Sequence, residues 1–266
     1  MRKKRETAAF LAHLIVVFVP ATLLADNAFP EIPAIISSAV PGAGPIWISA
    51  EKAIAPDGTL RSEVLGTENV AHFERHLQRQ RERQSASANE LDQQECAIFF
   101  GRKLEHYKDN RSTRALTQNA VGIIEGTITR IESGFLAGTP GSLLLVKVQE
   151  RLKHSAAISD SEYLYIFFPY ARIQTKDGLI CANPVGTSMR PAVGDVVLAF
   201  PMVRALDADN RLLQIEPRRE LALEKPNGKA VLPDAFEGHH ISSIGEAETR
   251  IRALLNSSRE AAPEVH

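Results

Sequence analysis

The sequence predicts a mainly β fold with flanking helices (α+β): a small antiparallel barrel or sandwich of five to six strands, followed by a C-terminal helix. Short runs of alternating or fully apolar residues recur between about residues 115 and 235, separated by turn-forming residues. Asn227-Gly228 lies between two such runs and predicts a hairpin turn. Ser243 and Glu246 form a capping box ahead of a helical stripe.

Residues 1–25 are predicted to be a signal peptide. A basic start, from Arg2 to Arg5, precedes an apolar run from Thr7 to Ala25, and the expected cleavage lies before Asp26. We therefore expect an exported protein, periplasmic or extracellular. The apolar run is also long enough to cross a bilayer, so a retained membrane anchor is the alternative and the one route to a membrane contact.

Residues 26–67 are rich in Pro, Gly and Ala and predict an irregular linker. Within it, Pro56-Asp57-Gly58 predicts a turn between two short strands, and Trp47 is expected to anchor the segment to the folded body. Residues 68–114 predict a helical segment with a thin apolar stripe, and a strand at "CAIFF" competes with the second helix there.

Residues 115–235 carry the β-strand patterns. In "LLLVKVQERLKHS", for example, apolar and polar side chains alternate. Residues 236–256 predict a loop and the C-terminal helix, in which Glu246/Arg250 and Glu248/Arg252 are spaced as i,i+4 pairs. Residues 257–266 are expected to be a disordered tail.

The composition opposes a nucleic-acid partner. The chain has 31 Lys and Arg against 32 Asp and Glu, so there is no basic excess to attract a polyanion. No phosphate-binding loop, dinucleotide fingerprint, CxxC or Ca²⁺-binding loop is present, and no cofactor is predicted.

The stretch "GTSMRPAVGDVVLAF" contains a candidate nucleophile, Ser188. A serine can be activated by a lysine whose neutral amine accepts the hydroxyl proton, and Lys225 or Lys229 on a later hairpin could serve. Ser188-Met189, Pro191 and Gly194-Asp195 resemble the nucleophile box of bacterial signal peptidases, which implies a Ser/Lys peptidase. The box is two residues shorter than in that family, and Lys225 precedes a turn. The favoured interpretation is that Gly194 and Asp195 shape the entry into a strand over 196–200.

From about Val121 to Pro233, the order of "GxIxxIESGFLAGTPGSLLLVKVQERLKHS", "PxVGDVVLAF" and the Asn-Gly hairpin resembles uncharacterised exported bacterial β-domain proteins with an OB-like barrel. The resemblance implies a fold and a strand-entry role for Gly194-Asp195. It implies no activity.

Cys96 and Cys181 are the two cysteines, and in an exported chain they predict a disulfide; two buried thiols are the alternative. His72 and His76 are four residues apart on a predicted helix, and His239-His240 are adjacent in a loop. Neither pair brings a third ligand or a metalloprotease motif, so no metal site is predicted.

The function that these features favour is a non-catalytic binding or envelope-interaction domain with an unidentified protein or envelope ligand. The alternative is the Ser/Lys peptidase using Ser188 and Lys225. One strand and its exit carry four aromatic residues and an arginine: Tyr163, Tyr165, Phe168, Tyr170 and Arg172. Together they could form an aromatic and basic binding face, but a place in the core explains most of the aromatic residues better.

Overall fold

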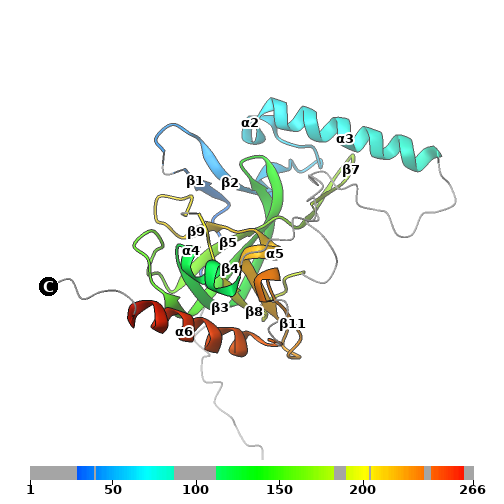
Figure 1. The fold of residues 1–266 in the computed structure, drawn as a ribbon. Coiled ribbons are helices and arrows are strands. Elements are labelled where there is room, and N and C mark those ends of the chain that lie inside the picture. Colours follow the sequence, from blue (N-terminus) through cyan, green and yellow to red (C-terminus); the bar gives the residue numbers. More distant parts are fainter. Residues whose placement is uncertain are drawn as a thin grey trace, which may run out of the picture. The chain divides into compact units, whose positions relative to one another are not determined.

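A long antiparallel hairpin, β3 (Ile123–Leu136) and β4 (Thr139–Lys153), forms the centre of the fold in the computed structural model (Figure 1). Its ladder runs from the Ile123–Lys153 pair to the Leu136–Thr139 pair. The structure describes residues 29–38, 40–86, 112–182, 190–203, 205–236 and 241–260. All elements below belong to one compact unit, Ile32–His266.

Nine strands join in one mixed sheet around this hairpin. The order is β11-β10-β8-β3-β4-β5-β9, and β2 pairs with the second half of β3 and with β1. Of the strand pairs in the described residues, β5 and β9 run parallel and the others antiparallel. A separate two-stranded sheet holds β6 and β7. The remaining strands are β1 (Ile35–Ser37), β2 (Pro45–Ser49), β5 (Tyr163–Phe168), β6 (Ala171–Thr175), β7 (Gly178–Ala182), β8 (Val196–Ala199), β9 (Leu212–Gln214), β10 (Leu221–Glu224) and β11 (Ala230–Val231).

Six α-helices and one 3₁₀ helix are described; the 3₁₀ helix and the last α-helix follow the last strand, and the others lie between strands. They are α1 (Ala50–Ala53), α2 (Ser62–Leu65), α3 (Thr67–Ala86), α4 (Thr113–Asn119), α5 (Pro217–Glu220), the 3₁₀ helix η2 (Asp234–Phe236) and α6 (Ile244–Glu260). Figure 1 shows α3 and α6 at opposite ends of the β3–β4 hairpin.

The mainly β class with a C-terminal helix is confirmed, but the small antiparallel barrel of five to six strands is not. Among the described residues the sheet has nine strands, is mixed, and does not close into a barrel. It grows beyond the prediction because β3 and β4, at 14 and 15 residues, are long enough to pair with β8 and β5 and still offer an edge to β2.

One face of the sheet nevertheless curls around a common core. Leu221 and Leu223 of β10 and Leu213 of β9 come from opposite ends of the strand order, yet they pack in the same apolar cluster with Ile128 and Leu144 of the central hairpin. This curvature follows from the natural right-handed twist of β-strands.

The segment predicted as a linker contains regular structure from Ile35 onward. Trp47 of β2 is fully buried, as expected of an anchor, and its ring contacts Phe167 of β5 edge-on at 6.4 Å. The turn at Pro56–Gly58 also forms, between the bridged residues Ile54 and Leu60. Proline and glycine obscured the strand pattern here because β1 and β2 are only three and five residues long.

The helix predicted after residue 67 is α3, and its thin apolar stripe is its buried face. Val70, Phe73 and Leu77 are buried, and the Phe73 ring lies 5.4 Å from that of Phe135 near the tip of the central hairpin. The second predicted helix, with its competing strand at "CAIFF", lies outside the described residues. Of the helices that the structure describes, none combines the length and apolar character needed to span a membrane.

The capping box of the C-terminal helix is present with a shifted partner. The Ser243 hydroxyl accepts the Glu246 backbone N–H at 3.2 Å, and the Glu246 carboxylate accepts the backbone N–H of Ser242 at 2.6 Å. These hydrogen bonds from Ser242 hold the pKa of Glu246 below its ordinary value. The box thus fixes the start of α6.

The two-residue turn of the central hairpin contains a strained residue. A type I′ turn requires positive φ at both central positions, and here φ is +46° at Ala137 and +80° at Gly138. Alanine pays a steric penalty in this conformation that asparagine largely avoids. We expect Ala137→Asn to stabilise the protein by about 0.5–1 kcal/mol in urea unfolding.

The control is Ala208→Asn, because Ala208 is also an exposed turn alanine but does not have positive φ. An equal gain from both substitutions would contradict strain at Ala137 as the cause.

Candidate functional site

The structure describes the second half of the predicted peptidase box. Ser188 and Met189 lie outside the described residues, whereas Asp195 and Lys225 are both described. Asp195 stands at the entry to β8 and is fully buried. Its Oδ2 atom lies 2.5 Å from the Lys225 Nζ atom and accepts the backbone N–H of Ala192 at 2.7 Å.

This pairing gives Lys225 a structural partner. Lys225 also donates to the Arg190 carbonyl at 2.5 Å, so one ammonium joins the β10–β11 hairpin to the chain entering β8. A general base must present a neutral amine, whereas an ion pair with a buried carboxylate uses the charged form. Lys229 is exposed on the same hairpin. These contacts favour an architectural role for Lys225.

The Gly-Asp pair also docks the turn onto the central hairpin. Gly194 adopts φ +92°, its N–H donates to the Ile128 carbonyl at 2.8 Å, and the Ile128 N–H donates back to the Asp195 carbonyl at 2.9 Å. Glycine is suited to this position because the left-handed conformation is costly for other residues.

The histidine pair on α3 comes together without a metal-binding constellation. The rings of His72 and His76 lie 4.6 Å apart. Within the described ranges, no group of three or more His, Cys, Asp or Glu side chains is placed to hold a metal ion. His239 and His240 fall outside those ranges.

The aromatic strand is mostly core. Tyr165 and Phe168 are buried, while Tyr163 and Tyr170 are half-buried. Burial raises the pKa of the Tyr165 phenol, and the Arg211 guanidinium lies 5.5 Å above its ring. The tyrosines therefore do not form one open binding face.

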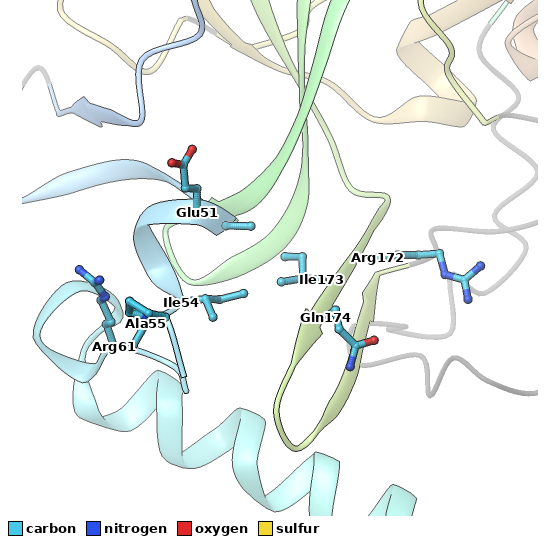
Figure 2. Close-up of a pocket in the computed structure, with 9 residues that line it drawn as sticks. Glu51, Ile54, Ala55, Arg61, Arg172, Ile173 and Gln174 are labelled. Carbon is cyan, nitrogen blue, oxygen red and sulfur yellow. The ribbon is translucent and has the colours of Figure 1, made fainter. Parts of the chain in front are cut away.

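The candidate binding site is a solvent-open groove of about 570 Å³ between α1 with its following turn and strand β6. Figure 2 shows Ile54 and Ile173 pointing toward each other across it, with Glu51 and Arg61 on the α1 side and the Arg172 side chain directed away from it. Its volume is in the range of small-ligand sites. The full lining is Ala50, Glu51, Ile54, Ala55, Pro56, Arg61, Arg172, Ile173 and Gln174.

One wall of the groove is held by local hydrogen bonds. The buried Ser49 hydroxyl accepts the Lys52 N–H at 3.3 Å and caps α1, which ends at the extended residue Ile54. The Asp57 carboxylate accepts from the Thr59 hydroxyl at 2.6 Å and from its backbone N–H at 3.0 Å, which lowers the pKa of Asp57. These hydrogen bonds define the conformation of the turn that follows α1.

The other wall is the edge of a strand. Successive side chains of a strand point to opposite faces of the sheet. Arg172, Ile173 and Gln174 are consecutive and all line the groove, so the groove runs along the edge of β6 and not over one of its faces. In the described part of the chain, β6 pairs with one strand, β7, which lies along the edge of β6 opposite the groove. Just beyond β6, the N–H of the turn residue Lys176 donates to the carbonyl of the turn residue Gly58 at 2.9 Å, so the two walls are joined at this end of the groove.

The rim carries charge of both signs. Glu51 and Arg61 take part in none of the ion pairs formed among the described residues. The Gln174 amide is used locally, since it donates to the Thr175 carbonyl at 2.8 Å. Arg61 is thus a cation able to meet a carboxylate of a ligand.

Sequence patterns did not indicate this groove. Its walls come from residues 50–61 and 172–174, and no motif links the two segments. Pro56-Asp57-Gly58 gave the one local signal, for the turn that forms part of a wall.

Cys181 is buried in β7 and is not a free thiol. Its predicted partner, Cys96, lies outside the described residues.

Comparison with known proteins found no match: no protein-family model matches the chain, and no curated protein is significantly similar to it.

The structural role of Lys225 can be tested by removing its charge. Lys225→Met leaves the Asp195 carboxylate buried without its cation, and we expect a loss of about 3 kcal/mol in the free energy of unfolding. Asp195→Asn in the same chain should recover part of the loss, because the buried charge is then gone as well.

Lys229→Met is the matched control on the same hairpin and should change stability by less than about 0.5 kcal/mol. If Lys225→Met costs no more than this control, the ion pair does not support the fold.

Proposed function

We propose that this chain is an exported, non-catalytic binding domain that takes an extended peptide segment along the edge of β6. The observation that carries the proposal is the groove between α1 and β6, one wall of which is a strand edge. A strand edge offers backbone donors and acceptors in the spacing that an extended peptide matches, a recognised mode of peptide binding.

The groove also indicates which side chains the peptide should carry. Half-buried Ile54 offers apolar surface that an aliphatic side chain of the peptide could cover, beside Ile173, which is already buried in the core. Arg61 at the rim is complementary to a carboxylate. The occupant proposed is therefore an extended segment of a partner protein with an apolar residue and a nearby Asp or Glu.

Export through the signal segment and the Cys96–Cys181 disulfide belong to the same proposal. Cys181 lies in β7, which pairs with the strand that lines the groove. A disulfide at this strand would restrain the hairpin whose outer edge receives the peptide.

Peptide binding is tested with the purified mature chain and a displayed library of random peptides, from which one enriched sequence is synthesised. We expect Arg61→Glu to weaken its binding at least about tenfold, the loss of one charge-assisted hydrogen bond. N-methylation of alternate peptide amides should weaken it similarly, because strand addition needs those N–H groups.

Arg75→Glu is the matched control, since Arg75 is an arginine on α3 that lines a different hollow. Failure to enrich any peptide, or equal binding by the two arginine variants, would overturn the proposal for this groove.

Export and the disulfide are tested together by intact mass analysis of protein recovered after expression with its N-terminal segment. The expected product starts at Asp26 and is lighter by two hydrogens than its reduced form. A full-length product would support the retained anchor, and an unchanged mass on reduction would contradict the disulfide.

A further inference from the structure

Helix α6 packs over the face of the sheet opposite the central apolar cluster. Ala247 and Ile251 of α6 are buried against Leu198 of β8 and Ala222 of β10. Next to this apolar contact, charged side chains of the helix lie against charged side chains of the sheet.

Three carboxyl groups from three elements meet at this edge. Glu125 of β3 and Glu150 of β4 are cross-strand partners. The Glu248 carboxyl group of α6 lies beside that of Glu125, within reach of a hydrogen bond if one of the two is protonated. The Arg252 guanidinium lies 2.5 Å from the Glu150 carboxylate. The helix spacing alone had paired Glu248 with Arg252, whereas the ion pair in the structure joins Arg252 to the sheet.

The charge balance of the cluster requires a proton. Arg252 offsets one carboxylate, Glu150, which leaves Glu125 and Glu248 facing each other. Two carboxyl groups form a hydrogen bond only when one of them is protonated, because a carboxylate is an acceptor alone. The Glu248 Oε1 atom is also buried and makes no hydrogen bond, so water does not stabilise a charge on it.

We propose that the proton shared by Glu125 and Glu248 is a latch that fastens α6 to the sheet, and that α6 loosens when alkaline pH removes this proton. Arg252 and Glu150 form the part of the contact that does not depend on the proton. Loosening would uncover the apolar side chains that α6 covers on β8 and β10.

The direction of the pH effect follows from the protonation of Glu248. Burial, with the hydrogen bond to Glu125 and the charge of that residue, raises the pKa of Glu248 from 4.5 to about 8. A carboxyl whose pKa is higher in the folded state stabilises the fold fully below the unfolded value. That contribution declines as the pH rises above 4.5 and is gone above about 8.

The other charged groups around α6 do not replace the proton. Arg114 on α4 is exposed, and the Glu224 carboxylate of β10 accepts the Ile244 backbone N–H at 2.7 Å at the start of the helix. Lys153 of β4 donates to the carbonyls at the end of α4, Gln118 and Ala120 among them. The groups that act on Glu248 are Glu125, Glu150 and Arg252.

The test is amide hydrogen exchange of the full mature chain at about pH 6 and about pH 9.5, corrected for the intrinsic exchange rate. We expect protection of the α6 amides to fall at least about tenfold at the higher pH, which corresponds to about one pKa unit. Amides of β4 and β5 should keep their protection, because the change is local.

Glu248→Gln is the deciding variant, since its amide can donate to the Glu125 carboxylate at any pH and should keep α6 protected at both. Glu162→Gln is the control, because Glu162 forms an exposed ion pair with Lys147 away from α6 and should leave the pH response intact. Equal α6 protection at both pH values in the unmodified chain would overturn the latch. An unchanged pH response in Glu248→Gln, or loss of protection in β4 and β5 together with α6, would also overturn it.

Discussion

The fold depends on one constraint: β3 and β4 remain paired along their whole length, although the two ends of this hairpin belong to different apolar clusters. Their ladder shifts register near Glu125–Gly126 and again around Thr129, whose hydroxyl donates across the ladder to the Leu145 carbonyl at 3.0 Å. Such bulges bend a strand and increase its twist without ending the pairing. Because of them, one hairpin supports β8 on its first half and β2 on its second.

Close contacts along the hairpin restrict which residues it can contain. A Cβ atom at Gly134 would lie 2.7 Å from the indole ring of Trp47, so the β2–β3 pairing requires glycine there. At the entry to β8, the buried Asp195 carboxylate needs the Lys225 ammonium, since an isolated buried charge is costly. Both contacts are tertiary, and both fix edges of the sheet to its centre.

Local patterns predicted those parts of the fold that local chemistry determines. Three predicted features depend only on residues close together in the sequence, and each occurs in the structure. They are the Asn227-Gly228 turn, the Ser243–Glu246 box and the apolar stripe of α3. The extent of the sheet was wrong because β1 and β2 are defined by what they pair with, and their own short sequences are rich in Pro and Gly.

The candidate site was less predictable than the fold for the same reason. Lys225 was identified from its chemistry, but its partner Asp195 was interpreted only as a turn residue, because cross-strand contacts do not show in a linear motif. The groove combines an α1 wall with a β6 edge, and the acidic cluster combines three separate elements. Each juxtaposition exists only once the central hairpin has set the register of its neighbours.

The groove and the α6 latch use different ends of that hairpin. The groove elements α1 and β6 contact β3 toward the turn, near Phe135, whereas α6 contacts β4, β8 and β10 at the open end. In the described ranges, β4 contacts both α6 and β6. Any influence of α6 on peptide binding would therefore have to pass through the β3–β4 ladder itself. A ladder paired along its whole length resists such a change, so loosening of α6 should expose its own apolar face while leaving the groove intact.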